Sequence, residues 1–556
     1  MPGSKTLSSG AIFSPPDILR RLLAERGISG LESLERYFNP SLKLIASPDG
    51  LPGIDVAAQL ILDADGEIIV FGDYDCDGVC ATAIVVGVLK ALGKNASPFL
   101  PERLSEGYGM SGASVSRMLQ THPEVRMVVT VDNGVNSVEE VAMLKDKGIA
   151  VVVSDHHLPG AVLPAADALV NPKVASSKEH GDLCGAGVAF MLANVLVDKA
   201  QKCGLYKGPK LGGPLLVLAG LATVTDLMPV LGQNRILVHE ALRLFHSCAP
   251  LGLRELFKKP AKTLTSRDFG FVLGPRINAA GRIASGMEAL ELLLCSDIES
   301  AKKLARQVDA RNDERKNIEQ EMVQKALEKI VPDAPAQVID LPDGHHGVAG
   351  IIASRVMEKL ASEESGAAVP VCIVVDGRGS ARSPSGINIR DAMESCADVL
   401  ERFGGHAAAG GFSVKPGKID EFRERLCEYC RNFSASMQER AGGAARVDAW
   451  LSPEDLTVEL AEWVAKMEPF GEGNPEPVFG LRDVELAEVK PMGVDGRHIS
   501  VSFRDRQIPR AVWWNRGDMI EELRASSSRK RNIAFKLSLS RYGELHVELI
   551  LLSLFD

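Results

Sequence analysis

Three aspartates stand at alternate positions directly after an apolar run of the sequence. In IIVFGDYDCDG, residues 68–78, they are Asp73, Asp75 and Asp77, and a glycine follows them. Side chains two residues apart in an extended chain point to the same side, so three like charges would repel one another. A bound cation would relieve this repulsion. The spacing therefore predicts a metal site.

Two more polar clusters follow apolar runs further along the chain. Asp132-Asn133-Gly134 comes after residues 126–131, and Asp155-His156-His157 comes after residues 149–154; a further acid, Asp226, lies in TVTDLMPV. Carboxylates with imidazole suit Mn²⁺ or Mg²⁺, and the histidine favours manganese. So many carboxylates exceed the needs of one ion. Two ions about 3.5–4 Å apart that share a carboxylate would use them and would suit hydrolysis at phosphorus.

Each of these features also has a purely structural explanation. An aspartate after a strand is often a helix N-cap, an Asp-Gly pair is a common turn, and a His-His pair can be surface scaffolding. The joint occurrence after three successive apolar runs favours the metal site, because independent caps and turns would not require it.

The elements that must position these residues follow an alternating pattern. Short valine- and isoleucine-rich runs alternate with helical segments, which predicts a parallel sheet covered on both faces. Ligands of such sheets bind beyond the carboxyl ends of the strands, so the three clusters would meet at one edge. The long apolar run 215–230 is predicted to be a buried helix rather than a strand.

The chain is long enough for three or four domains. Residues 299–331 contain no Gly or Pro and many good helix formers, which predicts a long helix. We expect a helical leader over 1–60, a catalytic α/β domain over 61–296, a long connecting helix over 297–333, a second α/β domain over 334–440 and a small β-barrel over 441–556.

Composition adds further bounds. The 556 residues carry a formal net charge of −10, which gives no overall attraction to nucleic acid, although the local potential of a groove decides binding. No uncharged apolar run reaches the length of a membrane span, and the N-terminus lacks a secretory pattern. We expect a cytoplasmic protein without membrane contact. The pair Cys427 and Cys430 is expected to be buried thiols rather than a zinc or redox site.

The motifs resemble a known family. DYDCDG, DNG, DHH and TDLMP, in this order, are similar to the four motifs of the DHH phosphoesterase superfamily. SEGYGM (105–110), GPRINAAGR (274–282), HHGVAGIIASR (345–355), GGHAAAGGF (404–412) and MEPFGEGNPEPVF (467–479) narrow the resemblance to the RecJ family of single-strand-specific 5′→3′ DNA exonucleases. The resemblance runs from about residue 40 to the end. It implies a DHH domain, a DHHA1-type substrate-binding domain and an OB-fold domain.

The resemblance also implies roles for the acidic and imidazole groups. Asp75 and Asp132 would hold one ion, and Asp132 would bridge to a second. The second ion would be held by Asp77, Asp132, His156 and Asp226. Asp73 would be a ligand or would orient the attacking water, because Phe71 stands where the superfamily's pyrophosphatases have a histidine ligand. Asp155 would fix a histidine, and His157 would contact the scissile phosphate.

Substrate binding is assigned to the GPRINAAGR segment (274–282) and to the second α/β domain. Arginines there could clamp phosphate in bidentate fashion, and a glycine-rich turn could offer backbone N–H groups to a terminal 5′-phosphate. Surface ion pairs, N-caps and a tight glycine turn are the structural alternatives. The predicted substrate-binding residues are Arg276, Asn278, Arg282, His346, Arg355, Arg378, Ser380, Arg382, Gly404, Gly405 and His406.

The C-terminal β domain offers candidates for single-strand contact. Phe503, Trp513 and Trp514 could stack on bases, but aromatic residues in a small barrel are more often core. The basic run 526–532 is either an electrostatic contact or a solvated hairpin loop.

The resemblance implies one function and leaves two alternatives. The expected function is a two-metal exonuclease that degrades single-stranded DNA 5′→3′ to 5′-mononucleotides in recombination and repair. A phosphodiesterase for short oligonucleotides or cyclic dinucleotides would use the same metals, and an inactive binding subunit would have lost ligands that this chain retains. From the family we expect a monomer that works with single-strand-binding protein and a RecQ-type helicase.

Overall fold

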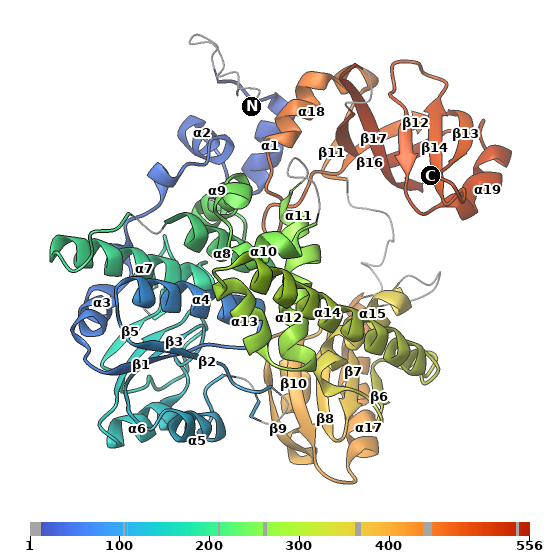
Figure 1. The fold of residues 1–556 in the computed structure, drawn as a ribbon. Coiled ribbons are helices and arrows are strands. Elements are labelled where there is room, and N and C mark those ends of the chain that lie inside the picture. Colours follow the sequence, from blue (N-terminus) through green and yellow to red (C-terminus); the bar gives the residue numbers. More distant parts are fainter. Residues whose placement is uncertain are drawn as a thin grey trace.

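The computed structural model describes residues 13–103, 106–107, 109–174, 176–209, 212–258, 264–361, 368–437, 447–540 and 544–555. Three sheets organise the chain, and a set of helices joins the first two (Figure 1). Within these ranges, no helix combines the length and apolar character needed to span a bilayer. Ser105 and Tyr108 of the SEGYGM motif, and residues 438–446 at the last predicted boundary, lie outside the described residues.

The first sheet is parallel throughout, in the order β2-β1-β3-β4-β5. Alternate residues of β1 face two different cores: Ile68 and Val70 pack with α3, α4 and α7, while Ile69 and Phe71 pack with α5 and α6. This two-sided burial explains the continuous apolar runs, and it confirms the expected helix-covered parallel sheet. The elements are β1 (Glu67–Phe71), β2 (Ala96–Phe99), β3 (Val125–Val131), β4 (Ala150–Ser154), β5 (Ala168–Val170), α3 (Ile54–Asp63), α4 (Cys76–Ala91), α5 (Gly112–Thr121), α6 (Val138–Asp146) and α7 (Gly185–Lys202).

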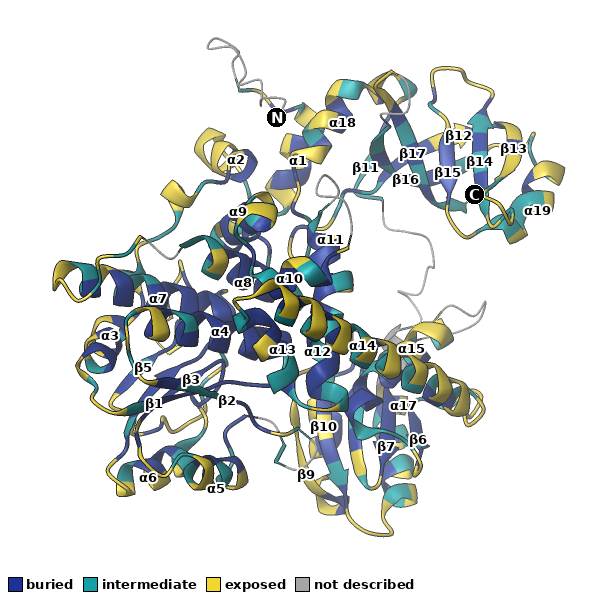
Figure 2. Cartoon of the chain, viewed as in Figure 1, coloured by how far each residue is buried: buried dark blue, intermediate teal, exposed yellow. Residues whose placement is uncertain are grey.

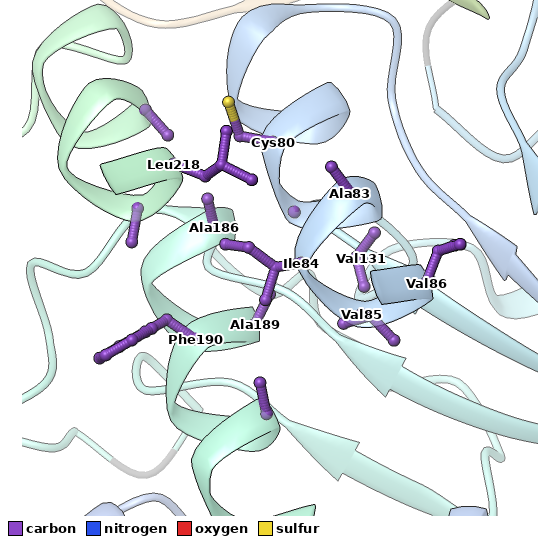
Figure 3. Packing of buried hydrophobic residues seen from close by; sticks show 14 of the residues in the cluster. Cys80, Ala83, Ile84, Val85, Val86, Val131, Ala186, Ala189, Phe190 and Leu218 are labelled. Atoms are coloured by element: carbon purple, nitrogen blue, oxygen red, sulfur yellow. The ribbon is translucent and has the colours of Figure 1, made fainter. Parts of the chain in front are cut away.

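A helical layer continues the core of the first sheet. Small and branched side chains let α4 pack closely on α7 and α8, as Ala186, Ala189 and Leu218 do around Ile84 (Figure 3). The run 215–230 is a helix as predicted, although it ends at Thr225, directly before Asp226. The layer contains α8 (Gly212–Thr225), α9 (Gly232–Cys248), α10 (Leu251–Leu256), α11 (Ser266–Asp268), the π-helical turn η4 (Phe269–Leu273), α12 (Gly274–Ile283) and α13 (Gly286–Leu294).

The predicted connecting helix is α14 (Ile298–Leu327), 30 residues long. Asp297 caps it by accepting a hydrogen bond from the N–H of Ser300 at 2.8 Å. Its inner side packs on α10, α12 and α13 and its far end on α15, while its outer side is exposed (Figure 2).

The second sheet is mixed, in the order β6-β7-β8-β10-β9. Cys430 lies in the core between this sheet and α17, and Cys427 packs against that core, which favours the interpretation as buried thiols. The elements are β6 (Gln337–Asp340), β7 (Val371–Val375), β8 (Arg378–Arg382), β9 (Leu400–Gly405), β10 (Ala409–Val414), α15 (Ala349–Ala361), α16 (Ile389–Glu394) and α17 (Ile419–Met437).

In the described residues the C-terminal domain forms one sheet of seven strands, in the order β11-β12-β16-β17-β15-β14-β13. Phe503 and Trp513 are buried in its core, so the base-stacking alternative is wrong for both; Trp514 is 48% exposed. The elements are β11 (Ala449–Trp450), β12 (Phe479–Val484), β13 (Leu486–Met492), β14 (His498–Phe503), β15 (Ala511–Trp513), β16 (Arg531–Ser540), β17 (His546–Phe555), α18 (Val458–Ala465) and α19 (Ile520–Ala525).

The N-terminal helices α1 (Asp17–Glu25) and α2 (Leu31–Phe38) do not form a separate leader. Leu23 and Phe38 share one apolar core with Val464 of α18 and with the C-terminal strands, and Figure 1 shows α1 beside α18. The two ends of the chain therefore fold against each other.

A buried arginine of α9 ties this unit to the catalytic domain. All five N–H groups of the Arg235 guanidinium donate to backbone carbonyls at 2.8–3.2 Å, namely those of Tyr37, Lys466, Met467, Glu468 and Pro469. The guanidinium also lies 3.9 Å from the centroid of the Tyr37 ring. Burial lowers the pKa of Arg235 to about 10. The first residues of the segment MEPFGEGNPEPVF, Met467–Pro469, therefore have a structural role: they join the C-terminal unit to the catalytic domain.

Candidate metal centre and phosphate site

The first acidic loop follows β1 and leads into α4. The Asp75 carboxylate caps α4 by accepting from the N–H of Gly78 at 3.0 Å. Asp73 accepts from the N–H of Tyr74 at 2.6 Å through Oδ1, while its buried Oδ2 has no hydrogen-bond partner. A Cβ at position 78 would lie 2.6 Å from Asp73, so the loop needs glycine there. Asp75 is therefore a helix N-cap, as the structural alternative predicted. Its carboxylate also lies close enough to the other acids for its charge to act on Asp73 and Asp132.

Asp77 is held by the start of another helix. Its carboxylate oxygens accept from the N–H groups of Gly185 and Ala186, both at 2.7 Å, at the N-terminus of α7. A Cβ on Gly185 would lie 2.5 Å from the Asp132 carboxylate, so only glycine lets α7 approach this closely. The helix terminus therefore fixes Asp77 against Asp132.

His156 joins the acids of the other elements. Its Nε2 lies 3.1 Å from Asp132 Oδ1, 3.6 Å from Asp77 Oδ2 and 3.7 Å from Asp226 Oδ2. Asp132 follows β3 with φ of 62°, a left-handed conformation that Asp tolerates better than most residues. The first turn of α4, the carboxyl ends of β3 and β4 and the end of α8 thus deliver one side chain each to a single point.

Asp155 orients the neighbouring histidine. Its Oδ1 accepts from the N–H groups of His156 and His157 and lies 2.8 Å from His157 Nδ1, while Oδ2 accepts from the N–H of Val135 at 2.9 Å. Although burial lowers the pKa of His157, the hydrogen bond to Asp155 raises it to about 9. His157 is therefore positively charged near neutral pH.

Burial and crowding disfavour negative charge on the acids. Burial first and the charge of Asp75 second raise the pKa of Asp73 to about 8, and burial with Asp77 raises that of Asp226 to about 8. The pKa of Asp132 is raised well above its usual range for the same reasons, and burial lowers that of His156 to about 4. Uncompensated carboxylates beside a neutral imidazole have the donor chemistry of a divalent-cation site.

Ligand atoms of two groups approach closely enough to share an ion. The donors of Asp132, His156 and His157 lie within 4.8 Å of one another, as do those of Asp77, His156 and Asp226. Within the described ranges these are the two groups of three with this spacing. Asp73 and Asp75 lie outside both groups, although the charge of Asp75 acts on Asp73, Asp132 and Asp226.

A second group of polar side chains near Tyr74 is basic rather than acidic. The Arg103 guanidinium is 5.3 Å from the Tyr74 ring centroid. Burial, and then the charge of Arg103, lowers the pKa of both Arg282 and Arg382, to about 10 for Arg282. Burial, Arg103 and Arg378 together lower the pKa of His346 to about 4, and the buried His346 Nδ1 has no hydrogen-bond partner. Such mutual repulsion marks a site for an anion.

Comparison with known proteins agrees with this geometry. Family models match in three places: DHH family, N-terminal domain, over residues 67–212, DHHA1 domain over 333–432 and RecJ OB domain over 447–551. A single-stranded-DNA-specific exonuclease RecJ from Dickeya dadantii is 36% identical over 515 residues, 88% of this chain and 87% of that protein. The chain belongs to the RecJ family.

Solved RecJ structures support the same assignment. A Mn²⁺ complex from Thermus thermophilus has a TM-score of 0.78 at 30% identity and covers 98% of this chain and 78% of that one. A Mg²⁺ complex from the same organism has a TM-score of 0.73 at 29% identity, over 98% and 77% of the two chains. These comparisons confirm the expected RecJ resemblance and the fold of two α/β domains followed by an OB domain.

The structure of this RecJ-family chain distributes the predicted substrate residues unevenly. Asn278 lies at the acidic loop, where its Oδ1 accepts from the N–H of Cys76 at 2.7 Å. Arg282 Nη1 donates to the carbonyl of Gly347 at 3.4 Å, which joins α12 to the HHGVAG segment. Ser380 lies on β8, paired with Gly411 of β10, while Gly404 and Gly405 end β9 and His406 follows them.

Two predicted arginines are engaged elsewhere. Arg276 donates to Asp309 of α14 at 2.7 Å, and Arg355 donates to Glu319 and Glu358, both at 3.2 Å. These contacts match the ion-pair alternative, and we leave both residues out of the phosphate site.

Arg103 was missed by the sequence reasoning. It stands alone in a loop, where periodicity gives no signal. Its position four residues after Phe99, at the carboxyl end of β2, was the signal that could have found it, because β2 ends at the same sheet edge as β1.

Proposed function

We propose that this RecJ-family chain is a metal-dependent exonuclease that degrades single-stranded DNA from the 5′ end to 5′-mononucleotides. One observation carries the proposal: a buried acidic and imidazole centre adjoins a cluster of arginines, since the charge of Arg103 acts on Asp73 and that of Asp75 acts on Arg282. The acids suit cations, and the arginines suit the terminal phosphate of a strand whose first linkage lies at the acids.

The acidic centre fits two Mn²⁺ or Mg²⁺ ions. Asp77, Asp132, His156 and Asp226 would hold one ion. Asp132 with Asp75 would hold the other, and the unpartnered Oδ2 of Asp73 gives it a free donor atom. Bound there, the ions would lower the pKa of water and neutralise charge on the phosphate. The contribution of the chain is to hold the ligands in fixed positions. The N–H groups at the N-terminus of α7 hold the Asp77 carboxylate beside the other acids.

His157 would act as a hydrogen-bond donor to the substrate. Asp155 holds its Nδ1, and Nε2 of the protonated ring would donate to a non-bridging oxygen of the scissile phosphate. The raised pKa keeps that proton in place near neutral pH.

Capture of a terminal phosphate would explain both end dependence and polarity. Arg103, Arg282 and Arg382 together supply many N–H donors, and a terminal phosphate carries more charge than an internal one. The neutral imidazole of His346 could add one more contact. A 5′-phosphate held here would leave the first internucleotide linkage at the acidic centre.

Strand selection, biological role and partners rest on the family. The relatives are named single-stranded-DNA-specific exonucleases, and the OB domain with its exposed Trp514 would contact the strand beyond the catalytic domain. Action in recombination and repair, a cytoplasmic monomer, and work with single-strand-binding protein and a RecQ-type helicase remain predictions.

The test compares end-labelled single-stranded and blunt duplex DNA with Mn²⁺ or Mg²⁺ and the Asp132→Asn variant. Asn accepts the left-handed backbone at this position, so the variant removes a ligand without adding strain. We expect 5′-labelled mononucleotides from the single strand, none from the variant, and normal turnover by the exposed-site control Asp313→Ala.

Three results would count against the proposal. Equal digestion of the duplex would remove strand selection. Preference for two- to four-nucleotide substrates over long strands would favour the oligonucleotide phosphodiesterase. Unaffected turnover by Asp132→Asn would remove the metal centre from the mechanism.

A further inference from the structure

Two large apolar side chains lie in solvent beside the acidic centre. Leu227, directly after Asp226, is 72% exposed, and Phe271 is 75% exposed. A large apolar side chain left in water gives up the stabilisation that burial would provide. Stability therefore does not explain either exposure.

The backbone is unusual at both positions. Leu227 has φ of 55°, in the left-handed region that leucine rarely adopts. Phe271 lies in the π-helical turn η4. This turn joins α11 to α12, and both of these helices are labelled in Figure 1. Such turns and strained residues are costly and cluster at functional sites. Two local distortions that each project an apolar side chain outward therefore indicate a ligand.

The turn η4, which carries Phe271, packs closely on the end of α8. A Cβ on Gly270 would lie 3.4 Å from Val224, and one on Gly274 would lie 2.2 Å from Thr225. The turn η4 is thus pressed against the last residues of α8, immediately before Asp226. The absence of a Cβ at Gly270 and Gly274 is therefore what lets η4 approach the end of α8 this closely.

The same segment also contacts the junction that leads to the β domain. The Ser266 hydroxyl donates to the carbonyl of Phe470 at 2.6 Å, and the N–H of Val230 donates to that of Glu472 at 2.8 Å. The stretch from α8 to α12, which includes Phe271, therefore contacts both the acidic centre and the segment that leads to the OB domain.

The phosphate site lies at the opposite end of α12. This helix begins right after η4, extends for 10 residues, or about 15 Å, and ends at Ile283 beside Arg282. A strand with its 5′-phosphate at Arg282 and its first linkage at the acids would continue toward η4.

We propose that Phe271 is a stacking platform for a nucleobase on the 3′ side of the scissile phosphate. Arg267, exposed, with its guanidinium 5.5 Å from the Phe271 ring centroid, would contact the adjacent backbone phosphate. Stacking on an aromatic ring tolerates every base, as a nuclease without sequence preference requires. The inference rests on the proposed 5′→3′ function and adds a downstream contact to it.

The test uses two 5′-phosphorylated single strands, one ordinary and one abasic at its second, third and fourth nucleotides. For Phe271→Ala we expect kcat/KM on the ordinary strand to fall about tenfold, mainly through KM. The wild type should lose a similar factor on the abasic strand, where the variant should lose almost nothing more. Phe271→Trp should restore activity, Phe271→Leu should not, and the exposed-leucine control Leu31→Ala should match the wild type.

Two outcomes overturn the inference while leaving the proposed function intact. One is wild-type kcat/KM for Phe271→Ala on the ordinary strand; the other is a loss that persists undiminished on the abasic strand. Melting temperature checks folding, and Phe271→Trp keeps the test valid if alanine unfolds the turn. If the wild type releases nothing from the 5′ end, the proposed function fails. The platform can then still be tested by equilibrium binding, where Phe271→Ala should raise the Kd for the ordinary strand about tenfold and leave the Kd for the abasic strand almost unchanged.

Discussion

Two buried charged centres of this protein differ in how their polar atoms are satisfied. Every N–H of Arg235 donates to a backbone carbonyl, so this charge is fully partnered within the chain. In the acidic centre Asp73 Oδ2 and His156 Nδ1 have no hydrogen-bond partner, and Asp132 Oδ1 has only the 3.1 Å contact with His156 Nε2. Buried polar atoms are normally paired, so the exceptions show where a ligand completes the structure. The first centre stabilises the fold, and the second is built for chemistry.

The largest expected effect is on activity at the acidic centre. His156→Ala removes the imidazole that contacts Asp77, Asp132 and Asp226, and we expect exonuclease turnover to fall at least about 10³-fold. The control His546→Ala changes an exposed histidine of the OB domain and should retain full turnover. Residual activity of His156→Ala within tenfold of the wild type would contradict the role of this centre.

The next effect is on stability at the arginine junction. Arg235→Met leaves five carbonyl groups without their donors, and we expect the free energy of unfolding to fall by about 4 kcal/mol, measured by urea denaturation. Arg36→Met, an exposed arginine paired with Glu32 on α2, should cost less than about 0.5 kcal/mol. Equal losses for the two variants would remove the contrast between junction and surface.

Metal binding should stabilise the protein in a pH-dependent manner. At a Mn²⁺ concentration about 100 times its Kd, the gain is about 2.7 kcal/mol. Because the pKa values of Asp73 and Asp226 are raised to about 8, the metal-free folded state binds more protons than the unfolded state between about pH 4 and 8. These acids therefore lower metal-free stability as pH rises. Mn²⁺ would bind their ionised forms, so binding should release protons and strengthen as pH rises. Thermal shifts should grow from pH 6 to pH 8; a shift independent of pH would contradict this.

The smallest effect has the opposite sign from that at Arg235. Asp132→Asn removes one member of a crowded set of carboxylates, so the metal-free protein should gain about 1 kcal/mol at pH 8. Thermal unfolding in a chelator measures this gain. A clear loss of stability would show that Asp132 has a structural role beyond the metal site.

The acidic centre could be predicted from the sequence, but the junction around Arg235 could not. Asp77, Asp132 and His156 could be placed together because parallel strands deliver their carboxyl ends to one edge. Arg235 sits in an amphipathic helix, where a lone arginine is indistinguishable from a surface residue. The pairing of the N-terminal helices with the C-terminal core is a contact between opposite ends of the chain, and no local pattern encodes it.

The substrate residues show the same limit at the level of single side chains. Arg282 and Arg382 occur in glycine-containing motifs, which drew attention to them, while Arg276 in the same motif as Arg282 turns to Asp309. Which arginine faces the site depends on helix phase and on the position of α14. Arg103 lies outside all of the motifs, so no sequence pattern indicated its role.

Calorimetric titration of the metal-free protein with Mn²⁺ tests the central claim most directly. We expect two ions per chain with proton release in the wild type, and loss of at least one ion with Asp132→Asn at unchanged secondary structure. Undiminished Mn²⁺ binding by Asp132→Asn, or no binding by the wild type, would contradict the account.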